Sequence, residues 1–123
     1  MSKLDKLNIH ESLLNEVKIL QNILSNYCVS NDTKTYSIYL FGSFVSRCVS
    51  LTSDIDLLLL VDDCTKSKRD IQKMKWELEE YLESNFYNRQ VDLKAYNKEQ
   101  FHQLSNIENS FEHCINSYMI QLL

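Results

Sequence analysis

The sequence predicts an α/β (α+β) fold: a single domain in which helices pack against a small mixed β-sheet. Helical periodicity and strand-like apolar runs alternate along the chain, the order expected for a sheet covered by helices. One run, "IDLLLLV", is apolar almost without interruption, as expected for a strand buried on both faces. A length of 123 residues suffices for one hydrophobic core and leaves no room for a second, substrate-binding domain.

The chain is expected to begin with a helix from about Ile9 to Tyr27. Asn8, followed three residues later by Glu11, resembles a capping box at its start. The polar stretch "SNDTKT" (residues 30–35) is then expected to connect the helix to the first strand. Apolar residues recur at three- and four-residue steps along the helix: Leu13, Val17, Leu20, Leu24 and Tyr27.

Two strands are expected in the middle of the chain. "YSIYLF" (Tyr36–Phe41) is rich in β-branched and aromatic residues, and the run from Asp54 to Val61 is apolar after its two aspartates. From Phe44 to Ser50, no periodicity decides between helix, strand and loop.

The second half of the chain is expected to contain a long helix from about Lys66 to Ser84, a short strand (Arg89–Tyr96) and a helical segment from Asn97 onward. Trp76 falls outside the apolar stripe of the long helix and marks either an interface or a partly covered surface. The last residues, "SYMIQLL", fit either a final strand or a helix end. The apolar positions of the C-terminal helical segment are these: Phe101, Leu104, Ile107, Phe111 and Ile115.

Composition narrows the classes of function. The formal net charge of -4 argues against direct nucleic-acid binding, which needs a basic face. The four cysteines show no CxxC spacing, the start of the chain has no apolar run and no stretch is long enough for a membrane span, so a cytoplasmic protein with reduced thiols is expected. His113 and Cys114 could begin a zinc site, but nothing at ligand spacing completes one.

The only glycine of the chain, Gly42, follows the first expected strand and precedes Ser43. A glycine permits a tight turn and a close approach to the backbone. A helix starting there would point free N–H groups at an anion. Alternatively, the dipeptide forms an ordinary strand-to-helix turn with Ser43 as the N-cap.

Asp54 and Asp56 lie two residues apart, so their side chains are expected on one face of the strand. Adjacent carboxylates repel each other unless a cation neutralises them, and hard oxygen ligands suit magnesium. The alternative is a strand end whose acids are simply solvated. Asp92, in "QVDLK", would reach the same face if its strand lies beside the aspartate strand. The three carboxylates would then form a cage for two metal ions.

The strand ending in "LFGS", the ten residues after it, the "DID" of the next strand and the later Asp92 together resemble the polymerase-β superfamily of nucleotidyltransferases. Within it, the pattern is most similar to the minimal nucleotidyltransferase (MNT) branch. The resemblance covers roughly residues 36–96 and implies the nucleotidyltransferase fold.

By this resemblance, Gly42 and Ser43 would bind the triphosphate of ATP. Asp54, Asp56 and Asp92 would hold two Mg²⁺ ions, and Asp92 would also be the base for the acceptor hydroxyl.

The glycine turn departs from the family pattern. Phe44 and Ser46 stand where minimal members commonly carry arginines, and Arg47 stands where they carry a second glycine. Arg47 either supplies the missing positive charge for nucleotide binding or is a surface residue. This departure affects the expected phosphate binding more than the expected metal binding, because the three metal-binding aspartates of the family pattern are present.

Members of this superfamily transfer a nucleoside monophosphate to a hydroxyl and release pyrophosphate. The MNT branch is known for pairing, as the antitoxin, with HEPN ribonuclease toxins, and some members adenylylate the toxin. The resemblance therefore implies an ATP-dependent transferase that inactivates a HEPN-type toxin by attaching AMP. The acceptor would come from a partner chain or bind at a homodimer interface.

Two other functions stay open. The first is a non-catalytic antitoxin or scaffold that acts on its partner by contact alone, with the aspartates as relics of the fold. The second is a small-molecule, antibiotic-type nucleotidyltransferase, which is disfavoured because no acceptor domain is expected. Binding of magnesium-ATP would separate an enzyme from a contact-only protein.

Overall fold

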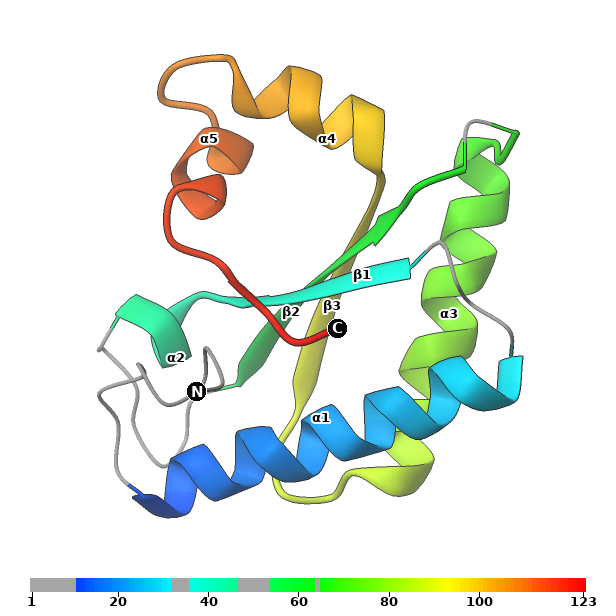
Figure 1. The fold of residues 1–123 in the computed structure, drawn as a ribbon, viewed down its shortest axis with the longest axis vertical. Helices are drawn as coiled ribbons and strands as arrows, with labels where there is room; N and C mark the ends of the chain where they lie inside the picture. Colours follow the sequence, from blue (N-terminus) through cyan, green and yellow to red (C-terminus); the bar gives the residue numbers. More distant parts are fainter. Residues whose placement is uncertain (1–10, 32–35, 47–53, 64) are drawn as a thin grey trace.

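The structure, a computed structural model, describes residues 11–31, 36–46, 54–63 and 65–123. Within these residues the strands form one mixed four-stranded sheet in the order β3-β2-β1-β4 (Figure 1). The elements follow one another as α1 (Glu11–Asn31), β1 (Tyr36–Phe41), α2 (Ser43–Ser46), β2 (Ile55–Val61), α3 (Lys68–Asn85), β3 (Val91–Asn97), α4 (Lys98–Ser105), α5 (Phe111–Asn116) and β4 (Ile120–Gln121).

The two central strands are β1 and β2. They pair antiparallel, with Leu40 opposite Leu57, while β2 and β3 pair parallel, with Leu57 opposite Leu93. The short β4 pairs antiparallel with β1 on its other side. α3 lies between β2 and β3 in the chain and forms the crossover connection that a parallel pair of strands requires.

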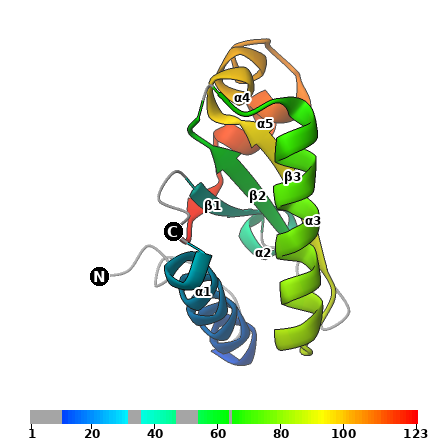
Figure 2. The ribbon, with the colours of Figure 1, turned by 90° about the vertical axis from the view of Figure 1, so that its right-hand side faces the viewer.

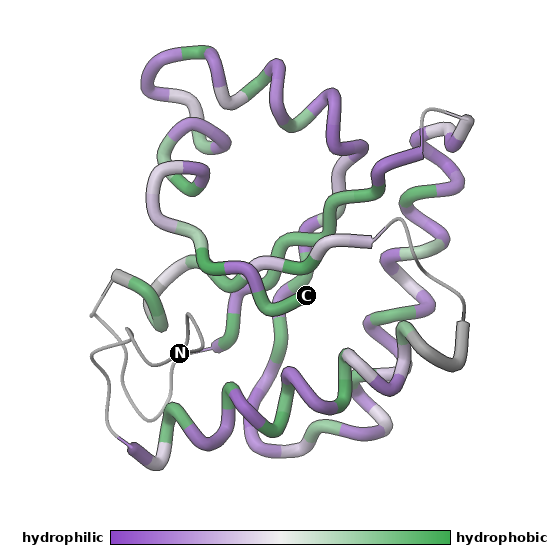
Figure 3. Tube along the Cα trace, in the orientation of Figure 1, coloured by the Kyte–Doolittle hydropathy of each residue, from purple (hydrophilic) through white to green (hydrophobic). Residues whose placement is uncertain are grey.

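Helices cover both faces of the sheet. α1 and α3 lie on one face and α4 and α5 on the other (Figures 1 and 2). Ile55, Leu57 and Leu59 of β2 belong to the core under α1 and α3, whereas Leu58 and Leu60 pack with residues of α4 and α5. This two-sided burial confirms the prediction from the apolar run, and β2 is accordingly hydrophobic along most of its length (Figure 3).

The first helix is longer at its end than expected. It continues to Asn31, four residues beyond Tyr27, so the first two residues of the expected connection are helical. The ring of Tyr27 packs on that of Tyr81 in α3, with 4.9 Å between centroids, and Cys28 packs against the core. Such tertiary contacts extend a helix into a polar stretch. The expected capping box at residues 8–11 lies partly outside the described residues.

The C-terminal segment is not one helix, contrary to the expectation from its apolar spacing. α4 ends at Ser105, and a turn containing Asn109 in the left-handed region (φ 65°) leads into α5. The Ser110 hydroxyl donates to the Leu104 carbonyl at 2.9 Å and accepts from the His113 amide at 3.0 Å. This N-cap starts a new helix where the spacing predicted a continuous one. The chain then closes the sheet as β4, which decides for the strand reading of "SYMIQLL".

The long helix α3 begins and ends close to the expected positions. Ser67 is its N-cap, and its hydroxyl accepts from the Asp70 amide while the Asp70 carboxylate accepts from the Ser67 amide. This capping box starts the helix at Lys68 rather than Lys66. In the part of the chain that the structure describes, no helix is long and apolar enough to cross a membrane.

Candidate active site

The candidate site lies where β1 ends and β2 begins. Asp56 is half-buried within β2, directly opposite Phe41, the last residue of β1. Asp54 immediately precedes β2 and is exposed. The side-chain alternation of β2 puts the Asp56 carboxylate on the face that also carries Leu58 and Leu60, and the charge of Asp54, just before the strand, acts on Asp56. On this face α4 and α5 pack on the apolar residues farther along β2.

Asp92 is the direct neighbour of Asp56 in the sheet. β3 runs parallel to β2 with Asp92 and Asp56 as register partners, and neighbouring strands lie about 4.8 Å apart. Residues in register on adjacent strands point to the same face, so the two carboxylates share it. The expectation that the two strands lie side by side is therefore met, and Asp92 is exposed on an edge strand.

The acids influence one another electrostatically. Burial raises the pKa of Asp56 above its ordinary value, and the negative charges of Asp92 and Asp54 raise it further. The positive charge of Lys94 on β3 acts in the opposite direction and is the weakest of these causes. The site thus holds more negative charge than the neighbouring cation compensates, which is the condition in which bound cations are favoured.

A complete metal cage is not formed by the side chains as they lie. Among the described residues, no three His, Cys, Asp or Glu side chains are grouped so that they could hold a metal ion. Magnesium, however, needs only one or two carboxylates and fills the rest of its shell with water and phosphate oxygens. Asp56 and Asp92, as neighbours on one face, fit that requirement in chemistry and number.

Gly42 is held against Asp56. Its φ of 77° lies in the left-handed region, which favours glycine. A Cβ atom at this position would lie 2.0 Å from Asp56 Oδ2, so the carboxylate occupies the space that any other residue would need. The glycine therefore serves the packing of an acid at the site as well as the turn.

The turn itself is short. Val45 donates its amide to the Gly42 carbonyl at 3.0 Å, and α2 has only four residues. A helix this short has only a small macrodipole. Any attraction of a phosphate to this turn would therefore come from hydrogen bonds donated by its backbone amides. The Ser43 side chain and Arg47, both expected to bind the nucleotide, lie outside what the structure describes.

Arg89 is a residue that the sequence did not single out. Its guanidinium forms a bidentate pair with Glu16 of α1, at 2.7 and 3.3 Å, and lies over the Phe44 ring of α2 at 5.1 Å from the centroid. It precedes Asp92 by three residues, and the adjacent Gln90 carbonyl accepts from the Ile55 amide. Arg89 thus connects the glycine turn to the strand of Asp92. The only indication in the sequence was a charged residue at the first position of the strand expected over Arg89–Tyr96.

A pocket of about 340 Å³ opens beside the site, between the end of α3 and the beginning of β3. Asp92, Glu79 and Glu83 contribute to its lining together with Arg89, whose charge is already paired with Glu16. Because this lining is mostly acidic, it disfavours a triphosphate that carries no bound cation.

Comparison with known families agrees with the fold. Residues 18–112, well over half of the chain, match the family described as polymerase beta, nucleotidyltransferase. The chain belongs to this nucleotidyltransferase family, as its motifs predicted.

Among solved structures, one described as a crystal structure of a toxin-antitoxin with AMP-PNP is similar to this chain, with 21% sequence identity and a TM-score of 0.45. The match covers 84% of this chain and 72% of that one. A likeness at this level adds no argument to the family match. No curated protein matches the chain significantly.

Proposed function

We propose that the chain is a magnesium-dependent nucleotidyltransferase that transfers AMP from ATP to a hydroxyl of a partner protein, and that the partner is a HEPN-type ribonuclease toxin. The observation that supports this most is the pairing of Asp56 with Asp92 in register, beside the glycine that ends β1. Carboxylates on adjacent strands next to a tight turn are what a metal-bound triphosphate requires.

Asp56 and Asp92 would hold the magnesium, and Asp54, exposed at the start of β2, would supply a further carboxylate. When bound, the metal ions neutralise phosphate charge and lower the pKa of the attacking hydroxyl. The half-burial of Asp56 places one carboxylate at a defined position, while the exposure of its two neighbours leaves them able to rotate toward a ligand.

The transfer would be an in-line displacement at the α-phosphorus. The acceptor oxygen forms a bond to phosphorus as the bond to the bridging oxygen breaks, and pyrophosphate leaves with that oxygen. The hydroxyl proton passes to Asp92. A protein hydroxyl could reach Asp92 because this residue is exposed on the edge strand β3.

The backbone around Gly42 would contact the phosphates. Gly42 takes the positive φ of a tight turn, and the backbone amides that follow the turn would contact the phosphates. Ser43 and Arg47 would add a hydroxyl and a positive charge, in line with the family resemblance. The antitoxin role and the toxin partner rest on the resemblance to the MNT branch.

A contact-only antitoxin is the second candidate. It is favoured by one observation: the carboxylates of the described residues are not gathered into a three-residue metal site. In that case the protein would bind its partner without transferring AMP.

Label transfer separates the two candidates. The chain is incubated with α-labelled ATP, magnesium and the product of the neighbouring gene, in parallel with Asp54→Ala/Asp56→Ala. Asp62→Asn is the matched control, because Asp62 is exposed at the other end of β2 and pairs only loosely with Lys98 at 3.7 Å.

A labelled partner with the unmodified chain and with Asp62→Asn, but not with the double variant, is the expected result. A stable complex of the two proteins without any label would contradict the proposed transferase activity and favour the contact-only antitoxin. Labelling by the double variant would show that the metal site has been assigned to the wrong residues.

A further inference from the structure

The outer side of α3 carries an ordered stripe of exposed side chains. The stripe repeats at steps of four and three residues, so its members lie along one side of the helix. It faces away from the apolar stripe of Ile71, Leu78 and Leu82, which packs into the core. In chain order the stripe reads basic, basic, aromatic, acidic, acidic: Arg69, Lys73, Trp76, Glu80 and Glu83.

The order of these charges is unfavourable for the isolated helix. A helix dipole favours acids near the N-terminus and bases near the C-terminus, whereas this stripe has its bases first and its acids last. The last turn of α3 contains no basic residue at all. Within the described part of the chain, the α3 ion pair is Lys75–Glu79, and none of the four charged stripe residues is in an ion pair. Interactions within α3 therefore do not explain the order of charges along the stripe, which points to a partner surface.

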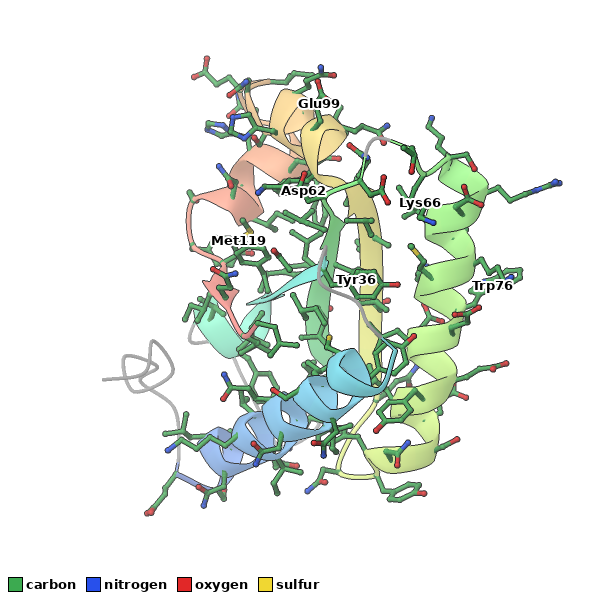
Figure 4. All side chains as sticks on the ribbon, turned by 45° about the vertical axis from the view of Figure 1, so that its right-hand side comes forward. Tyr36, Asp62, Lys66, Trp76, Glu99 and Met119 are labelled. Atoms are coloured by element: carbon green, nitrogen blue, oxygen red, sulfur yellow. The ribbon has the colours of Figure 1, made fainter. Side chains whose placement is uncertain are left out.

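Trp76 lies at the centre of the stripe. Its side chain is 66% exposed, a large apolar surface left in water. It points away from the rest of the molecule (Figure 4). A tryptophan in such a position contributes strongly when a partner surface covers it.

We propose that α3 is a self-complementary interface, on which a second copy of this chain packs antiparallel about a two-fold axis at Trp76. In that arrangement a residue a given number of positions before Trp76 faces the residue the same number after it in the other copy. Arg69 precedes Trp76 by seven positions and Glu83 follows it by seven, so the two face each other. Lys73 and Glu80 differ by one position, about 1.5 Å along the axis, and also meet.

The stripe selects a second copy over other partners. A uniformly acidic or basic surface would attract one half of the stripe and repel the other, whereas the antiparallel copy satisfies both halves at once and stacks the two tryptophans. The helix has 18 residues, about 27 Å of length, so the area it buries is at the low end of specific interfaces. We therefore expect a weak, salt-sensitive dimer with a Kd of about 10–100 µM.

This interface does not depend on the proposed transferase function. α3 packs on the face of the sheet opposite to the one that carries Asp56, and its Glu83 lines only the acidic pocket beside Asp92, so the proposed interface contains none of the three aspartates. Loss of one property should therefore leave the other unchanged. Failure of the transferase proposal would show as missing label with intact dimers, and failure of this one as monomers with intact binding or transfer.

Two charge variants and their mixture test the interface by sedimentation velocity over about a hundredfold range of concentration. Glu80→Lys/Glu83→Lys makes the stripe wholly basic, and Arg69→Glu/Lys73→Glu makes it wholly acidic. Each alone should associate at least about tenfold more weakly than the unmodified chain. Mixed in equal amounts they should form a heterodimer, because each stripe then faces its opposite.

Glu99→Lys/Glu108→Lys is the matched control for the basic variant: it makes the same change of net charge as Glu80→Lys/Glu83→Lys, at exposed residues outside α3, and should leave association unchanged. Trp76→Ala should weaken the dimer without altering the charges. Circular dichroism of each variant shows whether it folds. A monomeric unmodified chain throughout the range, or variants that behave alike alone and mixed, would overturn the proposal.

Discussion

At the scale of single residues, Gly42 and Asp56 depend on each other. The carboxylate of Asp56 fills the space beside Gly42 Cα, and Gly42 takes a φ of 77°. Asp56 in turn is half-buried beside two further acids, which raises its pKa together with burial. A residue of the proposed metal site is thus held in an environment that disfavours its own charge, as is common where function and stability compete.

Gly42→Ala should destabilise the protein by about 2–4 kcal/mol, because an alanine is strained at positive φ and its Cβ overlaps the Asp56 carboxylate. Chemical denaturation measures the loss, with Gln72→Ala at an exposed position of α3 as the control. Adding Asp56→Ala to Gly42→Ala should recover part of the loss, because the overlap disappears. Strictly additive effects would contradict the close packing of the two residues.

Asp56→Asn should raise the melting temperature of the metal-free protein by up to a few degrees, because it removes a charge that burial and the neighbouring acids disfavour. The same variant should lose transfer activity under the proposed function. Thermal melts in the presence of a chelator give the first result. Asp62→Asn, at an exposed position, should change neither property. A lower melting temperature for Asp56→Asn would contradict this electrostatic account of the site.

At the scale of elements, Arg89 joins three parts of the chain that are distant in sequence. Its side chain is only 9% exposed, pairs with Glu16 of α1 and covers the Phe44 ring of α2. Because Arg89 lies two residues before β3, this contact sets how the glycine turn lies relative to Asp92. The helix, the turn and the strand are positioned by one guanidinium whose planar geometry allows the bidentate pair and the ring contact together.

Arg89→Ala should cost about 2–4 kcal/mol of folding stability, because it leaves the Glu16 carboxylate without its partner in a mostly buried setting. Arg89→Ala and Glu16→Ala combined should cost less than the sum of the two single changes. Lys75→Ala breaks the more exposed Lys75–Glu79 pair on α3 and should cost no more than about 0.5 kcal/mol. Urea denaturation of the four proteins checks the cycle, and a loss for Arg89→Ala as small as the control's would contradict it.

At the scale of the whole molecule, the last residues close the sheet. Leu122 is buried in the main core, and its amide donates to the Ile38 carbonyl at 2.8 Å. Its own carbonyl accepts from the Gln21 side chain of α1 at 2.9 Å. The end of the chain therefore joins β1 to α1 and covers an edge of β1 that would otherwise be open to other chains.

Deletion of residues 119–123 should cost about 3–5 kcal/mol, because it removes the buried Leu122 and uncovers the β1 edge. The truncated protein should also aggregate more readily on heating. Denaturation and light scattering measure the two effects. Leu122→Ala should lose stability without aggregating, since the strand remains, and Gln121→Ala at an exposed position should do neither. Unchanged scattering by the truncated protein would show that β4 does not protect the edge.

The sequence by itself predicted most of the elements and named the candidate residues of the site. Local patterns with a period or a fixed spacing can be recognised in a sequence. Such patterns predicted the apolar run of β2, the strand before Gly42 and the acids at 54, 56 and 92. Where local pattern was ambiguous, the prediction was wrong or open: the turn at Asn109 broke an expected helix, and the polar end of α1 stayed helical.

Only the tertiary structure decided which residues meet. The register of Asp56 with Asp92, the Asp56 carboxylate against Gly42 and the contact of Arg89 with α1 and α2 all join positions from 14 to 73 residues apart. No local pattern encodes such pairs, because they arise when burial of the two cores fixes the strands and helices relative to one another. The sequence therefore predicts which acids belong to the candidate site, and tertiary packing brings those residues together.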